Sequence, residues 1–174
     1  RLSAIVEGDD YASVFSDVKL VSESVDYSIV NFESSIADPT QDKAITKCGP
    51  ALACSAKAVD ALKYAGFTCC SLANNHTYDY GDVGLNNVIS ALTERKMDYV
   101  GAGRNLSEAE KNKYVQLVDE RIAIINCCEH EFSVTDGNSA GTNPLNPVAQ
   151  WYPSPQEYAE SALHPLATHS PLSE

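Results

Sequence analysis

A near-continuous apolar run occupies residues 67–72 and lies between segments whose apolar residues recur at helical spacing. A strand that is apolar along its whole length has to be covered on both faces, as in a parallel sheet packed between helices. Helical spacing predicts helices over residues 10–24, 56–65, 83–96 and 105–112. Short strand-like runs over residues 26–32 and 97–101 separate them. This alternation predicts an α/β fold with βαβ units and a mostly parallel sheet.

The remaining segments before residue 130 are a loop and a pair of strands. Residues 34–54 contain two proline-bearing turn dipeptides and few periodic apolar residues, which predicts a long loop. Ser55 is placed to cap the helix that follows it. Residues 114–118 and 122–127 indicate two strands joined by a tight turn.

The charge of the chain limits its partners. The formal net charge is −12, and a field of that sign repels a phosphate backbone, so we expect no nucleic-acid partner. No apolar run approaches the length needed to cross a bilayer, so we expect no membrane segment within this sequence.

The six cysteines give an indication of the cellular compartment in which the protein is found. Four of them form adjacent pairs inside apolar stretches, and no C-x-x-C spacing occurs. We expect buried free thiols that act as small hydrophobic groups. Free thiols favour a reducing, cytoplasmic location. The chain opens on Arg1 and not on Met, so a preceding segment with an anchor would instead allow association with the cell envelope.

Polar side chains follow three of the predicted strands at the point where each strand ends. These sets are Glu33, Asn74-Asn75-His76 and Glu129-His130-Glu131. Carboxyl ends of parallel strands meet at one edge of a sheet, where ligands bind in open α/β folds. Carboxylate, carboxamide and imidazole groups together suit a divalent cation. Taken singly, Glu33 also fits a solvated loop acid, and His76 fits a capping residue.

Longer motifs then point to a family. Residues 64–81 resemble the AGF…LANNH…DYG signature of the CapA-like family of capsule synthesis (poly-γ-glutamate biosynthesis) proteins. Other segments are similar to the family's NLE motif, K.GP loop, VGAG.N..EA segment and E.EFS loop: residues 29–33, 47–50, 99–109 and 122–133. The resemblance covers residues 1–148, so we expect a partial domain there and a poorly matched tail over residues 149–174.

The resemblance implies a metallophosphatase-like (calcineurin-like) α/β/β/α sandwich. In that superfamily a strand-end acid bridges two metal ions, an Asn ligates one of them, and the next His faces the substrate. Carried over, Glu33 and Asn75 are metal ligands and His76 is the catalytic imidazole. Asp79 is assigned a catalytic orienting or substrate-contacting role, although it follows His76 by three residues instead of one. Substrate binding is assigned to Asn74, which replaces the usual Gly, and to Glu129 and His130, for which loop capping is the alternative.

Parts of the family pattern have no counterpart in this sequence. The Gly-Asp strand that carries the first metal ligand is missing, and so is a later His-bearing strand. We therefore expect an incomplete sandwich that lacks the first strand and the C-terminal half. With about half of a ligand set, the chain by itself should bind metal weakly and turn over no substrate. Open sheet edges should favour association.

These expectations define three functional hypotheses. The first is a metal-dependent phosphoesterase-type hydrolase in full-length form, using Mn, Fe, Zn or Mg and acting on a phosphoester or an anionic polymer. The second is a non-catalytic, metal-assisted binding or export component for an anionic capsule polymer. The third is a solute-binding α/β domain without metal. The sequence does not predict the oligomeric state.

Overall fold

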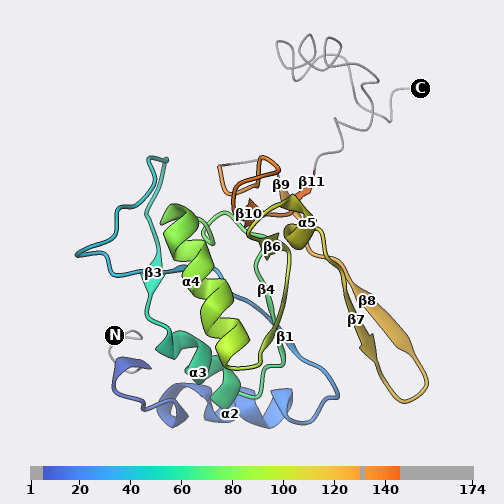
Figure 1. The fold of residues 1–174 in the computed structure, drawn as a ribbon. Helices are drawn as coiled ribbons and strands as arrows, with labels where there is room; N and C mark the ends of the chain where they lie inside the picture. Colours follow the sequence, from blue (N-terminus) through green and yellow to red (C-terminus); the bar gives the residue numbers. More distant parts are fainter. Residues whose placement is uncertain (1–5, 130–131, 146–174) are drawn as a thin grey trace, which may run out of the picture. The chain divides into compact units, whose positions relative to one another are not determined.

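A three-stranded parallel sheet forms the centre of the fold (Figure 1). The computed structural model describes residues 6–129 and 132–145. The chain divides into two compact units, Arg1–Pro144 and Leu145–Glu174, and Leu145 is the one described residue of the second. The sheet has the order β1-β4-β5, and its strands are β1 (Ile29–Asn31), β4 (Cys69–Ser71) and β5 (Asp98–Val100). The mixed α/β class with parallel strands is thereby confirmed, and the sandwich and its incompleteness stay predictions.

The helices lie within a few residues of their predicted bounds. They are α2 (Ala12–Ser22), α3 (Lys57–Tyr64), α4 (Gly81–Glu94) and α5 (Leu106–Ala109). In α4 the fully buried residues recur at the spacing of one helix face: Leu85, Val88, Ile89 and Leu92. They share one core cluster with Cys70 and Leu72. Each fully buried side chain of this size contributes about 1.5–3 kcal/mol to folding.

Two expectations for the segment before α3 are wrong. Ser55 does not cap the helix, because Ala56 is the N-cap residue and the Ser55 hydroxyl donates to the carboxylate of Glu7. The predicted loop of residues 34–54 contains two short parallel strands, β2 (Ser35–Ile36) and β3 (Ala53–Cys54). Each is two residues long, too short to leave a periodic pattern in the sequence.

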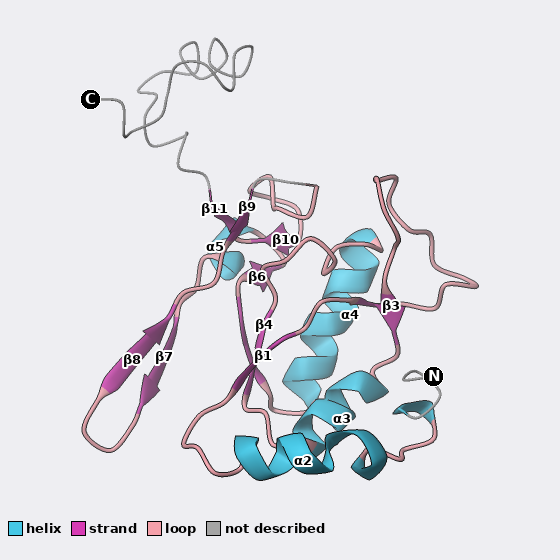
Figure 2. Ribbon diagram, turned by 180° about the vertical axis from the view of Figure 1, so that it is seen from behind, coloured by secondary structure: helices cyan, strands magenta, loops and turns pink. Residues whose placement is uncertain are grey.

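The predicted strand pair is an antiparallel hairpin of β7 (Lys113–Gln116) and β8 (Arg121–Ile124). Figures 1 and 2 both show it projecting from the helices and the parallel sheet. Among the described strands β8 pairs with β7 alone. The expectation that β8 joins the parallel sheet is therefore wrong, because the turn at residues 117–120 folds β8 back onto β7.

Four short strands follow β5 in the described part of the chain. They are β6 (Ala102–Gly103), β9 (Cys128–Glu129), β10 (Gly141–Thr142) and β11 (Pro144–Leu145), and β6 pairs with β10. Gly101, between β5 and β6, has φ +92°, and a Cβ there would collide with the carboxamide of Asn126. That carboxamide accepts a hydrogen bond from the backbone N–H of Ala73 at 2.8 Å. Glycine at this position therefore lets the segments after β4, β5 and β8 meet.

All six cysteines are free thiols, as expected. Cys69 and Cys70 are fully buried, and burial raises the pKa of the Cys70 thiol to about 12. Cys127 and Cys128 are only partly buried, so the expectation of two buried pairs holds for one pair.

None of the helices in the described ranges has both the length and the apolar character that a membrane span requires.

Candidate functional site

The turn that follows β4 is built around the side chain of Asn74. Its Oδ1 accepts hydrogen bonds from the backbone N–H groups of His76 and Thr77, both at 3.0 Å, and from the Thr77 hydroxyl at 2.8 Å. Its Nδ2 donates to the Phe32 carbonyl at 3.0 Å and to Asn31 Oδ1 at 3.1 Å. Asn74 therefore fixes the turn that carries His76 and ties it to the end of β1, and a glycine could not make these bonds.

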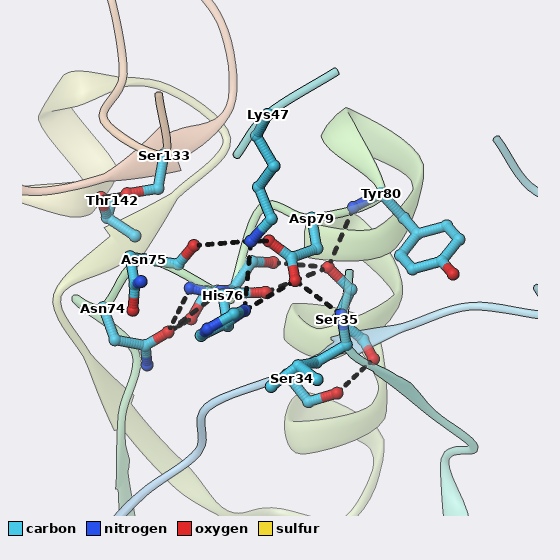
Figure 3. A network of polar contacts seen from close by, with 12 residues as sticks. Ser34, Ser35, Lys47, Asn74, Asn75, His76, Asp79, Tyr80, Ser133 and Thr142 are labelled. Atoms are coloured by element: carbon cyan, nitrogen blue, oxygen red, sulfur yellow. Dashed lines mark hydrogen bonds and ion pairs between the residues drawn. The ribbon is translucent and has the colours of Figure 1, made fainter. Parts of the chain in front are cut away.

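His76 is held by a buried acid from the same turn (Figure 3). Asp79 is 0% exposed in its side chain, and its Oδ2 lies 2.8 Å from His76 Nδ1. Oδ2 also accepts from the backbone N–H of Leu52 at 2.6 Å, and Oδ1 contacts the ammonium group of Lys47. The side chains of His76 and Lys47 are 14% and 3% exposed. Three donors thus converge on one buried carboxylate.

The contacts of His76 Nδ1 with Asp79 and Lys47 leave Nε2 as the other ring nitrogen of the imidazole. In the tautomer with the proton on Nδ1, His76 donates to a carboxylate that also accepts from Lys47 and Leu52, and the Lys47 ammonium lies 3.1 Å from the same Nδ1. Nε2 is then the nitrogen left to accept or deliver a proton. A buried ion pair also makes the geometry costly to disturb, because removing one partner leaves an uncompensated charge. Asp79 contacts no solvent and orients the imidazole.

Lys47 is a site residue that the sequence analysis did not assign. Lysine is rarely buried, so an ammonium group in a loop gives no sign of its burial. The available signal was its place in residues 47–50, which resemble the family's K.GP loop. The loop is tied to the turn by the Ile45 N–H, which donates to the Asp79 carbonyl at 2.9 Å. The Lys47 Nζ also lies 4.8 Å from the centre of the Phe132 ring, within cation–π range.

Beside this network lies a cavity of about 220 Å³, lined by Asn74, Asn75, Cys128, Glu129 and Ser133. It brings together Asn74, Asn75 and Glu129, three of the predicted site residues. The Cys128 thiol, which the sequence analysis did not assign, lies 3.1 Å from the Thr142 hydroxyl. Of the predicted residues, His130 lies outside the described ranges.

The two predicted metal ligands are at the surface. Glu33 is exposed, and its carboxylate accepts from Asn31 Nδ2 at 2.9 Å, so Asn31 links it to Asn74. Asn75 is exposed as well. Within residues 6–129 and 132–145, no three His, Cys, Asp or Glu side chains are grouped to hold a metal ion. Glu33 and Asn75 alone are fewer than the three or four ligands of protein zinc sites. The described residues therefore do not by themselves fit a metal ion.

Comparisons with known proteins agree with the motifs. Residues 1–167 match the family model described as "Bacterial capsule synthesis protein PGA_cap". The chain is 38% identical over 121 residues to the capsule biosynthesis protein CapA of Bacillus anthracis, an overlap of 68% of this chain and 28% of that protein. It is 33% identical over 107 residues to the PGA biosynthesis protein CapA of Bacillus subtilis, covering 62% of this chain and 28% of that protein.

A shorter match involves a mycobacterial protein. The chain is 38% identical over 64 residues to a probable polyglutamine synthesis accessory protein of Mycobacterium tuberculosis, covering 37% of this chain and 17% of that protein. The matched parts thus span little more than a quarter of the Bacillus relatives and less of the mycobacterial one.

Proposed function

The chain belongs to the PGA_cap family of bacterial capsule synthesis proteins, and from that premise we propose that it provides a phosphoesterase-type hydrolase site for the synthesis of an anionic capsule polymer. The names of its Bacillus relatives refer to the biosynthesis of a capsule and of PGA, which supports the pathway. The observation that carries the chemistry is the buried Asp79 carboxylate that orients His76 at the end of β4.

In this proposal His76 transfers the proton. With Nδ1–H bonded to Asp79, Nε2 can take a proton from water, and the imidazolium that forms can deliver that proton to a leaving oxygen. Proton transfer by a positioned side chain contributes about 10²–10⁴-fold to a reaction rate. Lys47 and Asp79 are positioning residues, since they act through the imidazole. Asn75 and Glu129 line the adjacent cavity, where a substrate would contact them.

A divalent ion, Mn, Fe, Zn or Mg, belongs to the proposal because Glu33 and Asn75 carry oxygen atoms that such ions bind. Since these two residues do not complete a site, further ligands would have to come from outside the described residues. The contribution of this chain's described part is the oriented imidazole and the two oxygen ligands.

The test uses this chain and a longer protein that contains it and is as long as the Bacillus relatives. We expect the longer protein to carry metal, measured by mass spectrometry, and to hydrolyse a simple phosphodiester. His76→Ala should lower the rate about 10²–10⁴-fold with the metal retained. Asn75→Ala and Glu33→Gln should lower the metal content. The matched controls, Asn138→Ala and Glu94→Gln, change the same residue types at exposed positions away from the site and should change neither quantity.

A second candidate function is favoured by the short ligand set. A protein that holds a metal loosely through Glu33 and Asn75 could use it to bind an anionic polymer without any hydrolysis. Metal and polymer bound by the longer protein, with no turnover and no effect of His76→Ala, would support this non-catalytic binding or export role and contradict the hydrolase.

A further inference from the structure

A second cavity, of about 290 Å³, lies where β5 leads into α5 and β7. Its polar and charged lining comprises Tyr99, Arg104, Glu108, Lys111, Asn112 and Lys113. We call this the basic cavity. Arg104 directly follows β6, the short strand after β5, and β5 is the parallel neighbour of β4. The basic cavity therefore lies beside β5, an edge strand of the parallel sheet, and Lys113 in its lining pairs with Asp98 at the start of that strand.

The charge of this lining is opposite to that of the chain. The chain has 24 acidic and 12 basic residues, yet the basic cavity is lined by three basic residues and one acid, Glu108. An anion that approaches a chain of net charge −12 is repelled on average. Binding of an anion is thus restricted to places where cations outnumber acids, and the basic cavity is such a place.

The acids near the basic cavity have structural roles that leave cationic groups available. The Glu108 carboxylate accepts from the backbone N–H of Arg104 at 3.0 Å, and the Arg104 guanidinium is 3.9 Å from it and about half exposed. Asp98 is paired with Lys113 at 2.6 Å. Lys111 is exposed and forms no ion pair with any other described residue. Arg104 and Lys111 can therefore bind a ligand without breaking a close pair.

The neutral residues of the lining also suit an anion. Tyr99 and Asn112 also line the cavity, and their side chains are of types that can donate hydrogen bonds. A guanidinium group binds a carboxylate through two parallel N–H bonds.

We propose that the basic cavity binds carboxylate groups of the polymer, with Arg104 and Lys111 as the main contacts. This assignment rests on the proposed function, synthesis of an anionic capsule polymer, and takes the polymer to be a chain of glutamate residues from the resemblance to poly-γ-glutamate biosynthesis proteins. It adds a binding site, separate from the His76 network, that holds the polymer by its repeated charge. A single carboxylate should bind weakly at so exposed a site, and several carboxylates on one chain should bind more tightly.

The test measures binding by calorimetry at low salt, on the 174-residue chain and without metal. The probes are a γ-linked glutamate pentamer, the same pentamer with its α-carboxyl groups converted to carboxamides, and free glutamate. We expect the charged pentamer to bind and the other two to bind at least about tenfold more weakly. The double variant Arg104→Gln, Lys111→Gln should bind the charged pentamer about tenfold more weakly, since two exposed charge contacts are lost.

The double variant Lys43→Gln, Lys96→Gln is the matched control, because it removes two positive charges from exposed positions that do not line the basic cavity and should leave binding unchanged. Circular dichroism checks that each variant is folded. Equal binding of the charged and carboxamide pentamers, or of free glutamate and the charged pentamer, would overturn the assignment, as would an unchanged affinity of the double variant.

The outcome is independent of the hydrolase proposal. Charge-dependent binding without any phosphoester turnover would contradict the hydrolase and leave the basic cavity standing. Turnover without charge-dependent binding would support the hydrolase and contradict polymer binding at the basic cavity.

Discussion

Two buried charges fix the shape of the turn around His76. The Lys47 ammonium and the Asp79 carboxylate are both removed from water and contact each other. Desolvation of two charges is costly, and their attraction offsets that cost only with good geometry and further hydrogen bonds. Leu52 and His76 supply those bonds to Asp79. We infer that the pair serves the placement of the imidazole more than the stability of the fold.

Lys47→Met tests this coupling. The substitution keeps most of the side-chain volume and leaves the Asp79 carboxylate buried without its cation, which should lower the free energy of unfolding by about 3–5 kcal/mol. Adding Asp79→Asn should restore part of the loss, so the double variant is more stable than the sum of the single changes predicts. Urea denaturation of the four proteins measures the coupling. Additive effects would contradict a direct ion pair, and Lys96→Met is the control.

At the scale of elements, a salt bridge joins two helices. Asp60 lies in the first turn of α3, and Arg95 is the C-cap residue of α4. The guanidinium binds both carboxylate oxygens, with Nε–Oδ1 at 2.7 Å and Nη2–Oδ2 at 2.8 Å. The hydrogen bonds from Arg95 lower the pKa of Asp60 below its ordinary value of 3.8. The contact therefore contributes most when the carboxyl group is ionised.

The lowered pKa of Asp60 predicts a pH dependence. A depressed folded-state pKa gives stability that is present above the unfolded value of 3.8 and is lost as the pH falls through the folded value. The carboxylate is more than a third exposed, so we expect a contribution of at most about 1 kcal/mol. Arg95→Gln should destabilise the chain at about pH 6 and have little effect well below 3.8. Urea denaturation at several pH values measures this, with Arg121→Gln as the control, and a pH-independent effect would contradict it.

At the scale of the whole molecule, net charge and exposed apolar surface have opposite effects on association between copies of the chain. Large apolar side chains that are exposed include Leu20, Val21, Val25, Ile29 and Val118. Such residues favour association when they gather in patches. The net charge of −12 makes copies of the chain repel one another. Salt at 0.1 M largely screens the repulsion between charges that are more than about 10 Å apart.

We therefore expect the chain to associate more strongly at high salt. Sedimentation velocity at about 20 mM and about 500 mM sodium chloride should show a larger mean mass at the higher concentration, because the Debye length shortens severalfold. Leu20→Glu should reduce this association, and Ser24→Glu is the control with the same added charge at a polar position. A mass that is independent of salt would contradict the role given to the net charge.

The sequence by itself determined the helices and the parallel strands. The spacing of apolar residues in α4 and the apolar run that contains β4 report which faces are buried, and burial of a helix or strand face is a local pattern. The polar residues after β1 and β4 could be placed at one sheet edge for the same reason, since parallel strands end together. Asn31 and Asn74 join these two ends in the structure.

Only the tertiary structure decided how distant segments meet. Lys47 pairs with Asp79 across 32 residues, and no local pattern marks a loop lysine as buried. The strands β2 and β3 are too short for any periodicity. Periodicity records whether a side chain is buried, and it carries no information on which partner satisfies a buried charge. That partner depends on the path of the loop through space.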